Sequence, residues 1–458
     1  MKTWFGKCLI VMLFALQAQA SQRAENPHPL SPRFLDVLVS TDHLTKSDRA
    51  SMERRKAGDE SVEWVIPVKI DLNALKGDRF EAFLFDRHVV IRRRESNLAP
   101  PQYGERWQGE VWLPGDAPDS DHMGLRDADF LIRRGRVTGA IRIGQIVYQL
   151  SSTSNGAYYI FKQDVSKLPE KDDVFVPDDA IYPSGSSTQP SYYIDLPIPR
   201  PSPPPQQIHT ARIVIGFSTE AMDGNLNALV DDIHYWVDQS RSAYSASGIP
   251  LMLDVAAFAQ PGYTESSISK TLNDLRRTDG PLWLLHQARH YQYADVMLMV
   301  VKGTNNWECG GTHNIGSTRE TAYMVVRRGC FSQGSIAHEL GHLLGAHHNQ
   351  EEVGHQPAKY EFGHGYYRDS EPHSGTPGFS TLMAYQRSCL YQCPRIMRFS
   401  DPRAIHNGHP RGTPYNNNVQ AILLNYGALA NYYPDPPRSN QSAQPLHTPQ
   451  GIRWIPAL

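Results

Sequence analysis

The chain of 458 residues is 40% hydrophobic and 20% charged, and its formal net charge at pH 7 is -2. This length and composition predict two or three globular domains with real cores and exclude a wholly disordered chain. The near-neutral charge excludes a general electrostatic attraction to nucleic acid or anionic lipid. We therefore expect no nucleic-acid partner.

The first 20 residues have the pattern of a secretory signal peptide. Two lysines precede a short apolar run, and the segment ends in the small-residue pattern Ala18-Gln19-Ala20. The apolar run is too short to cross about 30 Å of hydrocarbon, and no later segment reaches that length. The sequence therefore predicts a protein secreted to the periplasm or the extracellular space, without a membrane span.

Beyond the predicted signal peptide, the chain contains four cysteines. An even number in an exported chain favours two disulfides. Three pairings are open, and proximity in the sequence favours Cys309 with Cys330 and Cys389 with Cys393. A cysteine zinc site is less favoured because "CLYQC" has no matching second pair of ligands.

The chain divides into regions of different pattern. Residues 21–182 contain alternating runs such as "VEWVIPVKIDL" and "GRVTGAIRIGQIVYQL", which predict an antiparallel β-rich region with a hairpin turn at Gly144-Gln145. Residues 183–208 are rich in Pro and Ser and read as a linker.

After the linker, strand-like and helix-like segments alternate. "ARIVIGFS" and "ADVMLMVV" read as strands, and "LNALVDDIHYWVDQSRSAYSASG" reads as a helix. This order predicts an α/β layer with a mostly parallel sheet across residues 209–434. The composition of residues 435–458 predicts a disordered tail.

The segment "SIAHELGHLLGAHHN" carries the chemistry. Its apolar residues fall on one helical face, while His338 and His342 lie one turn apart on another. Two imidazoles in this arrangement can bind one zinc ion, with Glu339 beside them. Gly345 tolerates a turn out of the helix, which lets His348 return as a third ligand.

This ligand set suits a hydrolytic zinc site. Three neutral ligands leave the ion its full charge and one open position for a water, whose pKa falls to about 7. We expect Glu339 to accept the proton of that water and to pass it to the leaving amine. The sequence thus predicts one catalytic Zn²⁺, and nothing in it indicates calcium.

The same residues resemble a known family. "HELGHLLGAHH" is similar to the HExxHxxGxxH signature of the metzincin zinc endopeptidases. The resemblance implies a Met-turn beneath the zinc, and Met383 in "FSTLMAY" is the matching methionine. "FGHGYY", "RIMRFSDPR" and "NNNVQAILLNYG" look like the reprolysin-like branch, in particular bacterial secreted peptidyl-Asp-type metallopeptidases.

Three positions refine this resemblance. Asn349 stands where reprolysin-type enzymes usually have Asp, and it can still form hydrogen bonds to backbone near the Met-turn. Tyr385 falls where astacins and serralysins carry a tyrosine that stabilises the transition state, so it is a candidate for that role or a packing residue. "CGGTHNIG" lies where the family has a substrate-aligning edge strand, and His313 in it reads as a substrate-facing or surface residue.

By its position, the β-rich region resembles a prodomain that inhibits the enzyme within the same chain. A permanent accessory domain is the alternative. No cysteine lies between the signal peptide and Cys309, which excludes blockage of the zinc by a prodomain thiolate. Asp116 is the carboxylate candidate for such a block, although most such residues form turns.

We therefore predict an α/β (α+β) metzincin catalytic domain with a mostly parallel twisted sheet and an active-site helix, preceded by an antiparallel β-rich prodomain. The expected function is a secreted zinc metalloendopeptidase that hydrolyses proteins or peptides. One alternative is a gluzincin-type peptidase with Glu361 as third ligand. Another is a non-catalytic zinc-binding adhesin or structural module, against which the intact Glu339 argues.

Overall fold

The computed structural model describes most of the chain beyond residue 31. The predicted signal peptide lies outside the described residues, as do nearly all of the linker and most of the tail. The described residues are 32–38, 42, 44–57, 59–94, 103–116, 126–169, 207–303, 308–353, 358–371, 377–390, 393–435 and 454–456.

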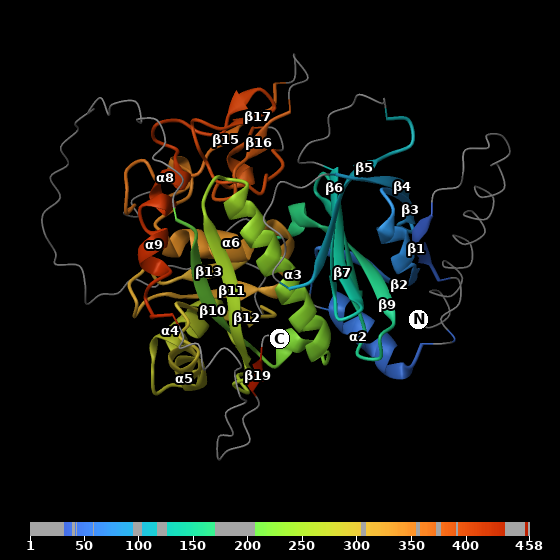
Figure 1. The fold of residues 1–458 in the computed structure, drawn as a ribbon, viewed down its shortest axis with the longest axis horizontal. Coiled ribbons are helices and arrows are strands. Elements are labelled where there is room, and N and C mark those ends of the chain that lie inside the picture. The colour runs from blue at the N-terminus through green and yellow to red at the C-terminus, as the bar shows by residue number, and fades with distance from the viewer. Residues whose placement is uncertain are drawn as a thin grey trace, which may run out of the picture.

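The N-terminal region folds into a closed barrel of nine strands (Figure 1). Its order is β1-β2-β9-β8-β7-β6-β5-β4-β3, with β1 parallel to β3 and every other pair antiparallel. The strands are β1 (Arg33–Val37), β2 (Val62–Ile70), β3 (Arg79–Phe83), β4 (His88–Arg93), β5 (Glu105–Trp112), β6 (Arg126–Arg133), β7 (Arg136–Ile143), β8 (Ile146–Ser152) and β9 (Tyr158–Asp164).

Two local signals explain parts of this barrel. The predicted turn at Gly144-Gln145 is confirmed, because it joins β7 to β8 and Gly144 has a φ of +61°. Helix α2 (Lys46–Lys56) begins at a capping box formed by Thr45 and Asp48. Closure of the sheet leaves no exposed edges between its strands.

Large aromatic side chains fill the barrel. Phe34, Phe80, Trp107 and Phe130 are each at most 1% exposed, and the rings of Phe80 and Trp107 lie 4.7 Å apart. The inside of the barrel is therefore a packed core, in which contacts between inward-facing residues of many strands stabilise the closed sheet.

The C-terminal region contains a six-stranded sheet in the order β13-β14-β12-β10-β11-β19. The inner strands pair in parallel, and β13 and β19 pair antiparallel at the two edges. The strands are β10 (His209–Phe217), β11 (Leu251–Ala259), β12 (Val296–Val301), β13 (Gly310–Thr312), β14 (Tyr323–Arg327) and β19 (Trp454–Pro456), the last from the segment that was expected to be disordered.

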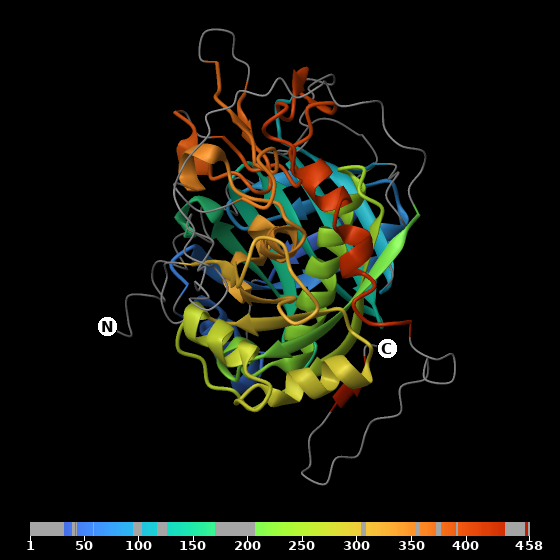
Figure 2. The same cartoon turned by 90° about the vertical axis from the view of Figure 1, so that its left-hand side faces the viewer.

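Helices cover both faces of this sheet. The longest is α3 (Leu226–Ser245), which packs with α6 (Ser335–Leu343) on the face that carries Ile213 and Ile215. Helices α4 (Ile268–Arg276) and α5 (Trp283–Tyr291) pack on the other face, as Figure 2 shows. Alternate residues of each strand thus serve two cores.

Short elements complete the region after α6. They are α7 (Gln350–Val353), the pair β15 (Tyr367–Arg368) and β16 (Phe379–Ser380), the pair β17 (Ile405–His406) and β18 (His409–Pro410), and helices α8 (Asn418–Leu423) and α9 (Tyr426–Leu429). The structure forms both disulfides that sequence proximity favoured, Cys309–Cys330 and Cys389–Cys393. Among the described residues, no helix combines the length and apolarity that crossing a bilayer requires.

The predicted fold class is wrong for this chain. The sequence predicts an α/β (α+β) metzincin catalytic domain with a mostly parallel twisted sheet, preceded by an antiparallel β-rich prodomain. In the described residues, the largest sheet is instead a closed barrel of nine strands, and helices are few. The parallel strands form only the inner part of a smaller mixed sheet. Alternation in a sequence indicates which residues face inward, but closure depends on strand number, tilt and stagger, which the pattern does not carry.

Candidate metal centre

Helix α6 carries the first part of the site. It begins after Gly334, whose φ is +78°, and the chain leaves it through Gly345, whose φ is +91°. Gly345 N–H donates to the His342 carbonyl at 2.9 Å, and Ala346 N–H donates to the Gly341 carbonyl at 2.9 Å. The glycine turn that the sequence predicted is therefore present, and it directs the chain back toward the helix.

The structure brings three predicted ligands together. The Nε2 atoms of His338 and His342 lie 3.1 Å apart, and that of His348 lies 3.1 Å from the first and 3.2 Å from the second. All three side chains are at most 3% exposed. Tetrahedral zinc bound at about 2.0–2.1 Å separates its nitrogen ligands by about 3.3–3.4 Å. The triad thus has the dimensions of a zinc site.

Backbone carbonyls orient two of the rings. His338 Nδ1 lies 3.0 Å from the Leu382 carbonyl oxygen, and His342 Nδ1 lies 2.8 Å from the Ala346 carbonyl oxygen. A carbonyl only accepts, so in the neutral rings Nδ1 carries the hydrogen and Nε2 carries the lone pair. Converging lone pairs repel each other unless a cation lies between them. This set of three imidazole ligands therefore fits zinc or a metal ion with similar ligand preferences.

Glu339 is completely buried beside the triad. Strand β13 passes directly against it: a Cβ placed on Gly310 would lie 2.8 Å from Cδ of Glu339. A side chain at position 310 would displace the carboxylate. The family resemblance assigns this strand to substrate alignment but does not predict that Gly310 makes room for the Glu339 side chain. The Gly-Gly pair in "CGGTHNIG" is the sequence signal for this close approach.

The segment that contains Met383 packs against helix α6. The methionine is fully buried, and its Sδ lies 3.0 Å from the position a Cβ on Gly341 would occupy. Its neighbour Leu382 provides the carbonyl that holds His338. Met383 therefore lies where a methionine turn would support the metal ligands.

Asn349 joins the third histidine to this segment. Its Oδ1 accepts a hydrogen bond from the Tyr385 backbone N–H at 3.0 Å, and its Nδ2 donates to Ser388 Oγ at 2.9 Å. The Tyr385 ring centroid lies 4.4 Å from that of His348, and Arg387 lies 4.7 Å above the same tyrosine ring. Tyr385 therefore contacts the triad through its ring.

A second histidine pair lies behind His348. The ring of His347 stacks on His364 with centroids 5.6 Å apart, and His364 Nδ1 lies 2.8 Å from the His348 carbonyl oxygen. Burial lowers the pKa of His364. His347 lies outside the triad. His364, in "FGHGYY", had been noted only as part of the resemblance.

Other sequence candidates lie elsewhere. Glu361 is exposed, unlike the buried triad, and it belongs to neither cluster of residues that could hold a metal ion. Asp116 follows strand β5, accepts from Leu113 N–H and pairs with Arg126 at the start of β6, so it stabilises a turn. His313 is 3% exposed and is not a surface residue.

A second metal-competent cluster combines Asp369 with Cys389 and Cys393. The two sulfur atoms already form a disulfide. A disulfide sulfur has no thiolate to offer a metal, so this cluster is structural.

No protein-family model matches the chain. Peptidyl-Asp metalloendopeptidases of Stenotrophomonas maltophilia are similar in sequence. That of strain K279a is 29% identical over 92% of this chain and 96% of its own length; that of strain R551-3 is 29% identical over 80% and 85%. A Xanthomonas campestris peptidyl-Asp metalloendopeptidase is 28% identical over 64% and 67%. These similarities support a metallopeptidase.

Two solved structures are more distant. A chain of a chaperone-substrate complex has a TM-score of 0.39 at 15% identity, covering 65% of this chain and 39% of its own. Metalloproteinase-II of Bacteroides fragilis has a TM-score of 0.34 at 13% identity, covering 75% and 91%. Both scores are too low to indicate a shared fold.

Proposed function

We propose that the protein is a zinc-dependent metalloendopeptidase. The observation that carries this proposal is the convergence of three Nε2 atoms within 3.2 Å of one another, beside a buried Glu339. A purely structural cluster has no reason to direct three imidazole nitrogens at one point. The similarity to metalloendopeptidases over nearly the whole chain agrees with this chemistry.

His338, His342 and His348 would hold the zinc ion, which would supply a Lewis acid able to polarise a peptide carbonyl and to lower the pKa of water to about 7. Glu339 is the general base. Its carboxylate takes a proton from the attacking water and delivers it to the departing amine, so that one residue serves both proton transfers. The carbonyls of Leu382 and Ala346 keep two of the ligand rings oriented throughout.

We infer that strand β13 aligns the substrate. It is the edge strand of its sheet, and Gly310 brings its backbone against Glu339. An extended peptide that adds to this edge would lie next to the base. Main-chain pairing tolerates many side chains, which suits an endopeptidase. Because the relatives are named for Asp, we extend the proposal to cleavage beside aspartate.

Some of the more detailed sequence predictions are supported by specific contacts. The HExxHxxGxxH spacing, the burial of Met383 beneath Gly341 and the bond from Asn349 to the Tyr385 backbone agree with a metzincin-type metal signature of the reprolysin-like branch. Export, latency and inhibition by the N-terminal region rest on the sequence pattern and on chain order alone, and they stay predictions.

The test is metal content and cleavage of casein by the full-length protein, before and after cutting between residues 183 and 208. Glu339→Gln should retain zinc and lose activity by about 10²–10⁴-fold. His348→Ala should lose zinc, and Glu361→Gln should behave as wild type. Zinc loss in Glu361→Gln would support a gluzincin. Unchanged cleavage by Glu339→Gln, or a zinc-loaded wild type that cuts nothing, would favour a binding module instead.

Specificity requires a separate experiment. Two peptides that differ only by Asp or Asn at one position isolate the charge of the side chain from its size. We expect at least tenfold faster cleavage of the Asp peptide. Equal rates would refute the preference and leave the peptidase assignment intact.

A further inference from the structure

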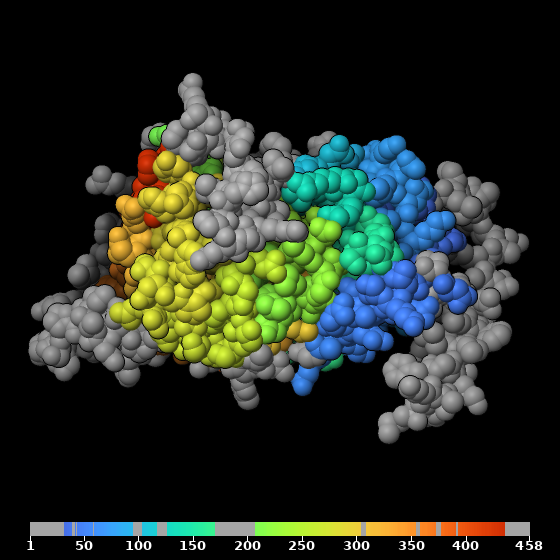
Figure 3. Space-filling view, turned by 90° about the horizontal axis from the view of Figure 1, so that it is seen from below, coloured from blue at the N-terminus to red at the C-terminus, as the bar shows by residue number. Residues whose placement is uncertain are grey.

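The barrel and the C-terminal region meet along helix α3. One side of this helix packs on α6, and another contacts strands β6, β7 and β8 of the barrel. Figure 3 shows the barrel, blue to teal, and the C-terminal region, green to yellow, in direct contact. The helix that supports the metal-binding helix is thus also the docking surface of the barrel.

The hydrophobic core is continuous across this contact. Leu131 and Val147 of the barrel belong to the same buried cluster as Ile233 and Trp236 of α3, and Leu168 joins them from the end of the N-terminal region. Two independent domains connected by a linker usually have separate cores with a polar contact between them. Here, separation would expose one large apolar face on each partner.

Buried ion pairs add charge complementarity. Arg106 of the barrel lies 3.2 Å from Asp238, with the two side chains 6% and 3% exposed. Arg133 and Arg136 lie 3.3 and 2.6 Å from Asp231, which is 5% exposed. The barrel supplies the arginines and α3 supplies the aspartates. Such desolvated pairs strongly favour the matching partner over others.

Hydrogen bonds also connect the barrel with the 3₁₀ turn η4 (Arg328–Gln333), which leads into α6. Gln163 Nε2 donates to the Gly329 carbonyl at 2.7 Å, and Arg142 Nη2 donates to the Ser332 carbonyl at 2.6 Å. Gln333 Nε2 donates in return to the Val165 carbonyl at 2.9 Å. Side chains of the N-terminal region therefore donate hydrogen bonds to backbone carbonyls of this turn.

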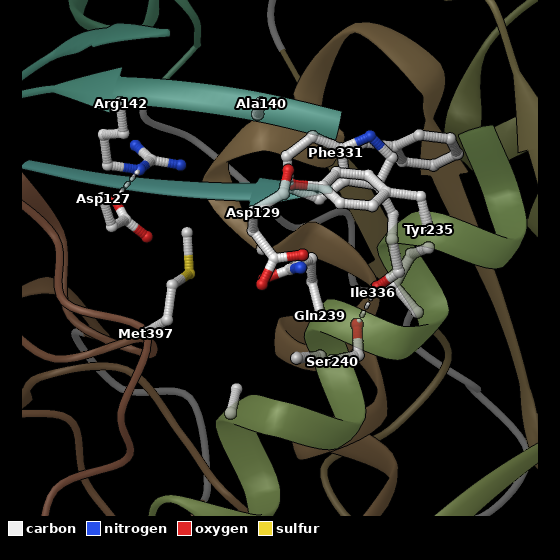
Figure 4. Close-up of a pocket in the computed structure, with 14 residues that line it drawn as sticks. Asp127, Asp129, Ala140, Arg142, Tyr235, Gln239, Ser240, Phe331, Ile336 and Met397 are labelled. Carbon is white, nitrogen blue, oxygen red and sulfur yellow. Dashed lines mark hydrogen bonds and ion pairs between the residues drawn. The ribbon is translucent and has the colours of Figure 1, made fainter. Parts of the chain in front are cut away.

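The two regions also enclose a small cavity of about 40 Å³ (Figure 4). Asp127 and Arg142 line it from the barrel, Gln239 and Ser240 from α3, and Met397 from the C-terminal end. Its wall is complete only when the barrel is docked. The contact thus combines an apolar core, buried ion pairs and this cavity, which has a mixed polar and apolar lining.

We propose that the barrel is a permanent partner of the C-terminal region, which stays bound along α3 as a one-to-one complex after the connecting segment is cut. Cutting the chain changes the covalent link and leaves the continuous core, the buried ion pairs and the bonds to η4 in place. This inference rests on the docking surface alone and does not require the proposed catalytic activity.

The test introduces a recognition sequence for a specific protease between residues 183 and 208 of the full-length protein. After complete cutting, the sample is examined by size-exclusion chromatography and analytical ultracentrifugation in 0.15 M and 1 M salt. We expect the two fragments to migrate together in equal amounts under both conditions. A barrel fragment that separates from the wild-type protein would overturn the proposal.

A charge reversal tests the surface itself. Asp231→Lys places a lysine against Arg133 and Arg136, and in the cut protein it should increase the dissociation constant at least tenfold. Asp36→Lys is the matched control, because it makes the same change at an exposed ion pair with Arg33. Equal dissociation of the two variants would refute the docking surface. If circular dichroism shows that uncut Asp231→Lys is unfolded, co-migration of the fragments of the cut wild-type protein alone decides whether the barrel stays bound.

Discussion

The two regions bury polar side chains in different ways. In the barrel, buried charges such as Arg106 and Asp129 lie 2.7 Å apart and form an ion pair. In the C-terminal region, His338, His342 and His348 have their Nε2 atoms directed at one point. The first arrangement stabilises a structure and the second prepares a binding site. Buried polar groups therefore reveal function by where they point rather than by being buried.

The largest effect is expected from a substitution that disrupts the metal-binding triad and leaves the barrel intact. His342→Ala removes one ligand, so we expect zinc content to fall below one tenth of the wild-type value and cleavage to fall at least about 10³-fold. Measurements are elemental analysis and casein cleavage, with His409→Ala, a partly exposed histidine, as control. Retention of full zinc content by His342→Ala would contradict the triad.

The complementary change breaks the barrel core. Trp107→Ala removes a side chain that is 1% exposed among Phe80 and Phe130, and it should lower the free energy of unfolding by about 3–5 kcal/mol. Urea unfolding followed by fluorescence measures this loss. Zinc content measured below the transition should stay at the wild-type level. A loss below 1 kcal/mol would show that the barrel is not tightly packed there.

A smaller change separates catalysis from metal binding. Gly310→Ala brings a methyl group against the Glu339 carboxylate, so we expect kcat to fall at least tenfold with zinc retained. Gly311→Ala tests the same strand beside this contact. The steady-state rate on a peptide provides the readout. Equal kcat in wild type and Gly310→Ala would show that the carboxylate moves aside without consequence.

The smallest effect is a pH dependence in the C-terminal region. Burial raises the pKa of Asp295 to about 6, against opposing hydrogen bonds from the Arg212 and Tyr433 backbone N–H groups. An unfolded aspartate has a pKa of about 3.9, so between pH 4 and 6 the folded state holds the extra proton. Stability from this group is full below about pH 4 and is lost as pH rises through 6.

Thermal unfolding of wild type and Asp295→Asn between pH 4 and 7 measures this contribution. The difference in Tm between the two proteins should change with pH in favour of the wild type at the acidic end. For Asp48 in the N-terminal region, we expect the opposite dependence of stability on pH. Burial raises its pKa, but hydrogen bonds from Thr153 and Thr45 outweigh burial and lower it. Its contribution is therefore lost as pH falls. Parallel profiles for Asp295→Asn and Asp48→Asn would contradict both signs.

The convergence of the three histidines was predictable because its information is local. His338 and His342 meet through helical spacing, and Gly345 and His348 follow within six residues, so a single turn and a single reversal set the geometry. The hairpin at Gly144 and the disulfide pairings were predictable for the same reason. Each depends on residues that are near one another in the chain.

Tertiary structure alone decided the rest, because the contacts involved join distant residues. Closure of the barrel joins β1 to β3 through register and strand tilt. The approach of Gly310 to Glu339 and the docking of Arg136 on Asp231 join segments 29 and 95 residues apart. Periodicity indicates which face of an element is buried, but it does not indicate against which partner. That choice depends on the packing of the whole chain.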